Sequence, residues 1–294
     1  METLVSESEI MQSPVRSRAP AYPTMKESWV ALAWFALIML LAAIPVFVIA
    51  NHVIHRKSIV VSTIATVLGE VATIGFLMWY WKQRRVPLRL LGQVPPWIYL
   101  ALPVIAFVQI ILRSSLYYLH LPNWMENSFR QLEMQPWLAF LMLVVAAPIL
   151  EEVLFRGILL NGLLRNYRPW VAIGQSALLF GVFHCNPVQT VSAGIMGLLL
   201  GWLFYRTQSL LLCIVLHALN NAVGLLGMLT HKANMVEPPH ASAGSWVAYT
   251  ILVVICGLLM AAFVLRVKQT TTPPALESDV DEAPALPEPE AILA

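Results

Sequence analysis

Three ionisable side chains, Glu151, Glu152 and Arg156, lie in a stretch of sequence (residues 137–164) that is otherwise apolar enough for a membrane. Each charge near the centre of a membrane helix costs roughly 2.5–3.5 kcal/mol on insertion scales, so such residues usually mark catalysis, transport or a buried contact. In a helix, Glu152 and Arg156 share one face at i,i+4 spacing, whereas Glu151 points about 100° away. We therefore expect Glu152 to neutralise Arg156 and Glu151 to remain free to meet water.

Two further apolar segments carry chemically useful side chains at the same four-residue spacing. Phe180 precedes His184, and His217 precedes Asn221. A carboxylate helped by a histidine can deprotonate a water molecule beside a scissile carbonyl. A second histidine and an amide can donate hydrogen bonds to the oxyanion that develops. Together with Glu151, these residues indicate peptide hydrolysis within the membrane.

Depth along the helices supports a common site. Counted from the nearest arginine of the predicted cytoplasmic side, Glu152, His184 and His217 lie roughly 20, 24 and 17 Å deep, at 1.5 Å per residue. Glu70, in the second apolar segment, lies at a similar level, roughly 18 Å from Lys82 by the same count. The three motifs can therefore meet at one level of the membrane.

The elements that must position these residues are helices. The chain has 294 residues, of which 59% are hydrophobic and 12% charged, whereas soluble domains carry about a quarter charged residues. We predict an all-α, polytopic membrane helix bundle of about eight transmembrane helices. A bilayer demands roughly 20 apolar residues per helix, and segments of about this length lie at residues 29–50, 59–81, 97–119, 137–160, 169–184, 188–205, 209–230 and 245–265.

The remaining sequence predicts the organisation around this bundle. We expect a disordered N-terminal tail (1–25), a transmembrane domain (26–268) with the motifs in its 137–230 core, and a disordered, acidic, Pro-rich C-terminal tail (269–294). Most Lys and Arg residues outside the helices fall in the tails and in alternate loops, which predicts that both termini are cytoplasmic. The protein is then an integral, multi-pass membrane protein, in the cell membrane if it is prokaryotic. A net charge of +2 gives no indication of a nucleic-acid partner.

The three motifs resemble the CPBP group, which includes type II CAAX prenyl endopeptidases and bacterial Abi or bacteriocin-processing relatives. The pattern of that group is EExxxR, then FxxxH, then HxxxN or HxxxD, and residues 151–156, 180–184 and 217–221 match it in order. The resemblance implies a glutamic-type intramembrane endopeptidase that needs no cofactor. Its implied partners are the lipid bilayer and a membrane-embedded or lipidated protein or peptide substrate.

The resemblance also implies a role for each motif residue. Glu151 would activate the water molecule together with His184, and His217 and Asn221 would form the oxyanion site. The other motif residues, Glu152, Arg156 and Phe180, would support the site.

Other functions remain compatible with the same residues. Glu151, His184 and His217 could form a His₂Glu zinc set, which would make the protease metal-dependent. Glu70, Glu151 and the histidines could instead form the proton pathway of a transporter. The chain could also be a non-catalytic membrane scaffold or immunity protein, and Asn221 could simply bridge two helices.

Four residues receive a structural interpretation. Arg113 is expected near the outer interface, where its long side chain can reach water. Gly197 and Gly201 are spaced as small-xxx-small, which predicts close helix packing. Pro148 denies the helix one backbone hydrogen bond beside the glutamate pair and can kink it.

Overall fold

The computed structural model describes residues 20–52, 59–80, 82, 86–230 and 243–273, and within these ranges the chain is helical, without a β-sheet. Seven of its helical segments are long and apolar enough to cross a membrane, and an eighth apolar helix is shorter. The prediction of a polytopic helix bundle is therefore confirmed. Most of both predicted tails lies outside the described residues.

The helices follow the predicted apolar segments. The fourth apolar segment continues six residues beyond its predicted end, as one helical rod from Pro136 to Asn166. A short polar helix, α4, was not predicted from the hydropathy. The bounds are α1 (Met25–His52), α2 (Ile59–Tyr80), α3 (Pro96–Ser114) with the 3-10 turn η2 (Ser115–Leu119), α4 (Glu126–Glu133), the rod α5 (Pro136–Ala139), η3 (Phe140–Ala146), α6 (Ala147–Glu152), η4 (Val153–Leu160) and α7 (Asn161–Asn166), then α8 (Pro169–Phe183), α9 (Pro187–Thr207), α10 (Leu210–Leu229) and α11 (Ala243–Thr270).

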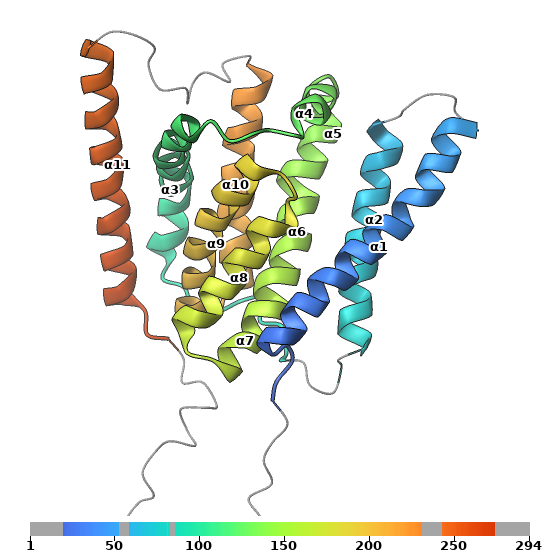
Figure 1. The fold of residues 1–294 in the computed structure, drawn as a ribbon. Helices are drawn as coiled ribbons and strands as arrows, with labels where there is room; N and C mark the ends of the chain where they lie inside the picture. Colours follow the sequence, from blue (N-terminus) through green and yellow to red (C-terminus); the bar gives the residue numbers. More distant parts are fainter. Residues whose placement is uncertain (1–19, 53–58, 81, 83–85, 231–242, 274–294) are drawn as a thin grey trace, which may run out of the picture.

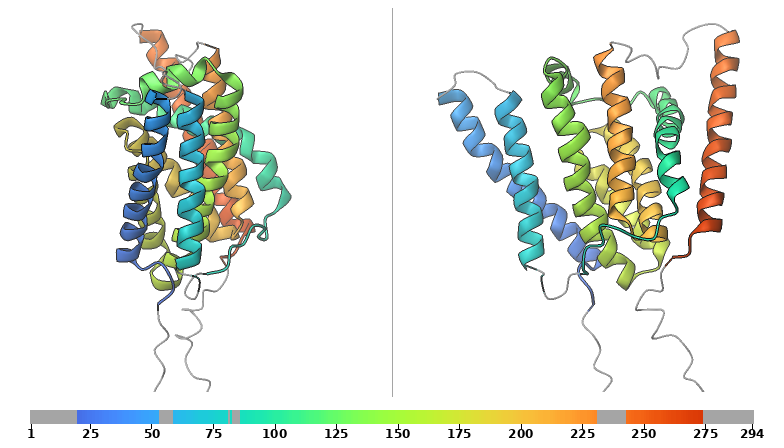
Figure 2. Two further views of the ribbon diagram at one scale, coloured as in Figure 1. Left: turned by 90° about the vertical axis from the view of Figure 1, so that its right-hand side faces the viewer. Right: turned by 180° about the vertical axis from the view of Figure 1, so that it is seen from behind.

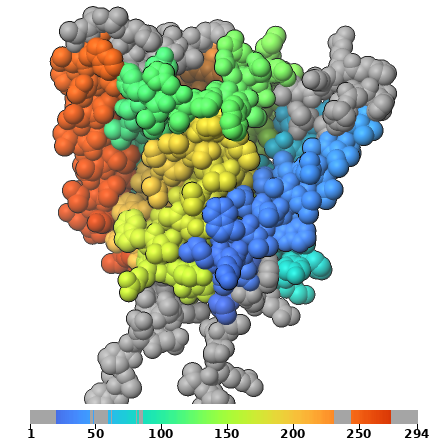
Figure 3. All heavy atoms as spheres, in the orientation of Figure 1, coloured from blue at the N-terminus to red at the C-terminus, as the bar shows by residue number. Residues whose placement is uncertain are grey.

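The bundle has a centre and two flanks. The rod that contains α6, the hairpin α8–α9 and α10 form the centre, with α3 packed against α10 (Figure 1). The hairpin of α1 and α2 lies on one flank and α11, which packs against α3, lies on the other (Figure 2). From the side shown in Figure 3, α8 and α9 form the surface between α1 and α11. The three motifs thus lie on central helices.

The rod that carries the two glutamates is not a regular α-helix. Its turns η3 and η4, on either side of α6, are π-helical, and turns of this kind occur often at functional sites. The N–H of Ala147 bonds to the carbonyl of Met142, five residues earlier. Pro148 has no N–H to donate. The sequence predicted that Pro148 disturbs the hydrogen bonds of this helix. In the structure the turn widens, and the carbonyl of Leu143 receives a backbone hydrogen bond neither from Ala147 nor from Pro148.

Small residues hold α8 and α9 close together. A Cβ atom on Gly197 would lie 3.0 Å from Cα of Ala177, and one on Gly201 would lie 3.2 Å from the side chain of Ile173. The predicted close packing at these two glycines is confirmed. It brings the backbone of α9 within reach of side chains that extend from the rod.

Both ends of the described chain are fixed to the same end of the bundle (Figure 1). The backbone N–H and carbonyl of Ala21 bond to the side-chain amide of Asn166, at 3.0 and 2.7 Å. The guanidinium of Arg206 donates to the hydroxyl of Thr271, at 3.0 Å. The described residues therefore include 20–25 and 269–273, which the sequence predicted as parts of the tails. The tail boundaries and the cytoplasmic location of both termini stay predictions.

Candidate active site

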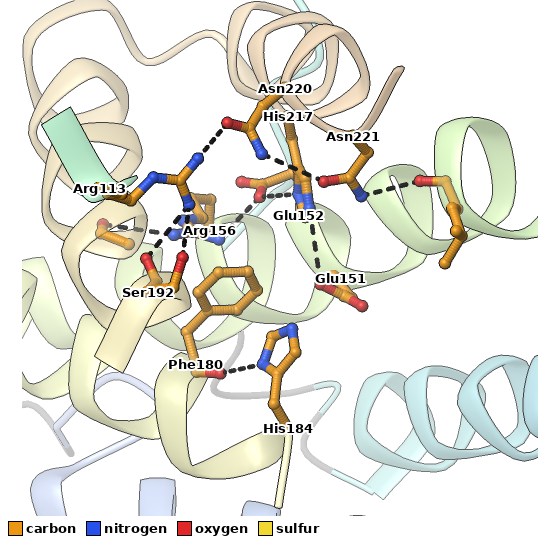
Figure 4. Close-up of polar contacts among 12 residues, drawn as sticks. Arg113, Glu151, Glu152, Arg156, Phe180, His184, Ser192, His217, Asn220 and Asn221 are labelled. Carbon is orange, nitrogen blue, oxygen red and sulfur yellow. Dashed lines mark hydrogen bonds and ion pairs between the residues drawn. The ribbon is translucent and has the colours of Figure 1, made fainter. Parts of the chain in front are cut away.

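A fully buried ion pair lies at the centre of the site. Nη1 of Arg156 is 2.7 Å from Oε1 of Glu152, and neither side chain is exposed. The same oxygen is 2.9 Å from Nδ1 of His217 (Figure 4). A carboxylate that already accepts from a guanidinium can only accept again, so Nδ1 of His217 carries the hydrogen. The structure thus places Glu152 against Arg156 as predicted, and it adds a contact with His217 that the spacing did not indicate.

The guanidinium of Arg156 is held from three sides. Besides Glu152, its Nη2 donates to the carbonyl of Gly197, at 3.3 Å. Its central carbon lies 4.4 Å from the centroid of the Phe180 ring, which is cation–π geometry. The Phe180 ring also meets the rings of His184 and His217 edge-on, with centroids 5.1 and 5.8 Å apart. Phe180 therefore packs between the buried cation and both histidines.

Glu151 points away from this ion pair and lines a cavity of about 520 Å³. Its Oε2 accepts no hydrogen bond from the described residues and lies 3.9 Å from Nε2 of His217. His184, Asn220 and Asn221 line the same cavity. The 100° turn between consecutive helical residues thus separates a paired carboxylate from one that faces open space.

His184 is held in one orientation by the end of α8. The helix tightens in its last turn, where the N–H of His184 bonds to the carbonyl of Gly181 instead of that of Phe180. The freed carbonyl of Phe180 lies 2.8 Å from Nδ1 of the His184 ring. A carbonyl only accepts, so Nδ1 carries the hydrogen and Nε2 has a free lone pair. In Figure 4 this ring points toward Glu151.

Asn221 belongs to a chain of polar contacts along one wall of the cavity. Its Nδ2 donates to the carbonyl of Leu143, at 2.8 Å, and its Oδ1 accepts from Nδ2 of Asn220, at 3.3 Å. The Oδ1 of Asn220 accepts in turn from the guanidinium of Arg113. Asn221 does bridge two helices, as one interpretation of the sequence held, but it does so at the cavity.

Arg113 lies in the last turn of α3, where its depth in the membrane stays a prediction, but it is held by protein groups as well as being able to reach water. Its side chain points into the bundle, lines the cavity and donates to the hydroxyl of Ser192, at 3.0 Å, as well as to Asn220. The reason is that α3 packs against α10, so the face of α3 that carries Arg113 is covered. The sequence contained an indication of this inward direction, because a charged arginine within an apolar segment costs insertion free energy, as Arg156 does. Asn220 and Ser192 carried no such indication.

Glu70 does not line the cavity, although it lies near enough to Glu151 to interact with it electrostatically. It is buried on α2, a helix that packs against α6. Its Oε2 has no hydrogen-bond partner in the described part of the chain. The similar depth predicted for Glu70 therefore does not make it part of the cavity.

The possible zinc set was tested on the same geometry. The described ranges contain no group of three or more His, Cys, Asp or Glu side chains that could hold a metal ion. Glu151, His184 and His217 line one cavity, and the bonds of Nδ1 to Phe180 and Glu152 leave Nε2 of each ring available, as in many metal-binding histidines. The metal-dependent alternative therefore stays a prediction.

Fold and site together define a class: a multi-pass helical membrane protein with a buried carboxylate–histidine cluster that opens onto an intramembrane cavity. Residues 133–223 match a family model described as type II CAAX prenyl endopeptidase Rce1-like. That segment contains all three motifs, so the resemblance inferred from them is confirmed over these residues. No curated protein and no solved structure matches the chain.

Proposed function

We propose that the protein is an intramembrane endopeptidase that hydrolyses a peptide bond of a membrane-embedded or lipidated protein or peptide. The observation that carries this proposal is the free carboxyl of Glu151, which faces a cavity beside two histidines of fixed orientation. A water molecule in the cavity can reach Glu151 without displacing a protein partner. The match to a CAAX endopeptidase model over residues 133–223 supports the same reaction class.

In this mechanism, Glu151 and His184 activate the water molecule. Both can accept a proton, Glu151 through its unpartnered oxygen and His184 through Nε2. The oxygen of the water forms a bond to the carbonyl carbon, and its proton passes to this pair. The tetrahedral intermediate then loses the amine when the carbon–nitrogen bond breaks, and the same proton is returned to the leaving nitrogen.

The negative charge of the intermediate needs donors, which we assign to Asn221 and His217. Asn221 donates only one of its N–H groups to a described residue, the carbonyl of Leu143, so the other is available. His217 keeps its Nδ1–H on Glu152, and its Nε2 becomes a donor when it takes up a second proton. Glu152 and Arg156 thus act through His217, whose ring they hold in place.

The test is cleavage by the purified protein in liposomes. Glu151→Gln and His184→Ala are expected to abolish cleavage while the protein still inserts and keeps its thermal stability. Thr73→Val is the control, because it removes a buried polar group from a membrane helix and lies outside the cavity. Cleavage that survives Glu151→Gln would refute the mechanism, and solute or proton flux lost with Glu70→Gln would favour the transporter.

The substrate can be sought in cells. Protein termini are compared between cells that express the wild type and cells that express Glu151→Gln, and new termini found only with the wild type identify the cleaved proteins. Peptides that contain these sites, with and without a lipid group, then show whether lipidation is required. A phenotype that is rescued equally by Glu151→Gln would favour the scaffold instead.

A further inference from the structure

Four groups on three helical segments form one continuous hydrogen-bonded chain beside the proposed catalytic residues. Arg113 of α3 donates to Asn220 of α10, Asn220 donates to Asn221, and Asn221 donates to the carbonyl of Leu143 in η3 (Figure 4). Arg113, Leu143 and both asparagines line the cavity. Arg113 lies outside the three sequence motifs, and Asn220 occupies a position of the third motif that the pattern leaves unspecified.

The chemistry of Arg113 fixes the direction of every bond in this chain. A guanidinium has only donors, so the side-chain oxygen of Asn220 must face it. The NH₂ group of Asn220 then faces Asn221 and can bond only to the oxygen of that amide. Asn221 is left with its NH₂ group on the far side. Of the two orientations open to an amide, Arg113 therefore selects one.

The other end of the chain imposes the same direction. The carbonyl of Leu143 can only accept, so it faces the NH₂ group of Asn221. This carbonyl is available because the wide turn sends the N–H of Ala147 to Met142 and because Pro148 has no N–H. Both ends of this hydrogen-bonded chain thus present the amide of Asn221 as a donor, with one N–H that bonds to none of the described residues.

We propose that Arg113 is a positioning residue, which acts through Asn220 to hold the amide of Asn221 with its free N–H ready for the oxyanion. The proposal rests on the proposed function, because it assigns a use to that N–H. It predicts effects on turnover rather than on substrate binding. It also predicts that Arg113 has no influence once Asn221 is removed.

A different role for Arg113 makes the opposite predictions. None of the described carboxylates lies within ion-pair distance of its guanidinium, whose partners are Gln109, Ser192 and Asn220. A carboxylate of the substrate, at its C-terminus or on an acidic side chain, could be its counterion. Loss of Arg113 would then raise KM for acidic peptides, and it would do so with or without Asn221.

The sharpest variant is Asn220→Asp. It keeps the size of the residue and an oxygen for Arg113, but it presents an acceptor to the oxygen of Asn221. We expect kcat to fall toward that of Asn221→Asp, roughly 10²-fold if one oxyanion donor is lost. Arg113→Met is expected to lower kcat with KM unchanged, and Arg113→Lys, which is also donor-only, to restore part of the loss. Wild-type kcat in Asn220→Asp would overturn the proposal.

Two comparisons separate the roles. In an Asn221→Ala background, Arg113→Met is expected to change kcat no further, whereas an additional loss would overturn the positioning role.

KM is measured with a peptide that has a free C-terminus, its C-terminal amide, and a variant without acidic side chains. A KM increase for one acidic form alone would show a substrate carboxylate site instead. Arg206→Met, which removes a guanidinium remote from the cavity, controls for stability.

A readout that does not need cleavage keeps this test independent of the proposed function. In protein with ¹⁵N-labelled asparagine, the side-chain signals of Asn220 and Asn221 are assigned by their loss in the two Asp variants. Arg113→Met is expected to shift the Asn221 pair and to speed its hydrogen exchange, whereas Arg206→Met leaves it unchanged. An unchanged Asn221 signal in Arg113→Met would overturn the proposal even if the protein cleaves nothing.

Discussion

His217 donates through Nδ1 to Glu152, at 2.9 Å, and this contact turns its Nε2 toward the cavity carboxyl of Glu151, 3.9 Å away. Glu152 accepts from Arg156 with the same oxygen. One buried carboxylate therefore neutralises a cation and also sets the tautomer of a histidine. The two adjacent glutamates have different tasks, because one faces the ion pair and the other faces the cavity.

Glu152→Gln should impair turnover more than substrate binding. The neutral amide no longer balances the charge of a His217 ring that is protonated at both nitrogens, which is the form assigned as a donor to the oxyanion. Removal of one oxyanion donor typically costs about 10²–10³ in kcat, and we expect a loss of roughly 10²-fold here. Steady-state kinetics check this. A kcat near the wild-type value would show that His217 does not depend on Glu152.

Arg156→Met should destabilise the protein, because it leaves the carboxylate of Glu152 buried without its cation. Breaking a buried ion pair by removal of one partner typically costs about 3–5 kcal/mol. The double variant Glu152→Gln/Arg156→Met has no unpaired charge and should recover much of that stability. Thermal unfolding in detergent measures both. If the double variant is no more stable than Arg156→Met, the ion pair is not the source of the loss.

Gly181→Ala should separate α8 from α9 and displace His184. A Cβ atom at Gly181 would lie 2.4 Å from the backbone carbonyl of Thr190, whereas one at Gly174, on the same helix, would meet nothing within 4 Å. We expect Gly181→Ala to lower both the unfolding temperature and cleavage. Gly174→Ala is the matched control, and it should be neutral or slightly stabilising, because alanine is favoured over glycine in helices by roughly 0.5–1 kcal/mol.

Pro148→Ala should reduce kcat without loss of stability. The substitution restores an N–H that can bond to the carbonyl of Leu143, which is the acceptor of Asn221. Competition for this carbonyl would loosen the amide of Asn221, while the helix gains a hydrogen bond. Kinetics and thermal unfolding are measured together. An increase in stability with unchanged kcat would show that Asn221 does not need Leu143.

Cleavage should be insensitive to chelators such as 1,10-phenanthroline. The described residues contain no group of three or more His, Cys, Asp or Glu side chains placed to hold a metal ion. Activity is compared before and after chelation and after addition of Zn²⁺. Strong loss that Zn²⁺ restores would establish the metal-dependent alternative.

The sequence by itself determined the helices and the neighbours along each of them. Apolar segments of membrane-spanning length must be helical, because the bilayer leaves backbone groups no other partners. The helical period then placed Arg156 beside Glu152 and turned Glu151 away, and the structure has both. The shared cavity of Glu151, His184 and His217 also followed from motif order and depth.

Only the tertiary structure decided how the helices face one another. The period of a helix fixes which residues share a face but not which neighbour covers it, and that choice depends on packing across the whole bundle. The inward direction of Arg113, the bond from His217 to Glu152, and the chain through Asn220 and Asn221 all depend on the rotations of α3 and α10 against the rod. The residues of the motifs could be found from spacing, whereas the groups that orient them lie on other helices at no fixed sequence distance.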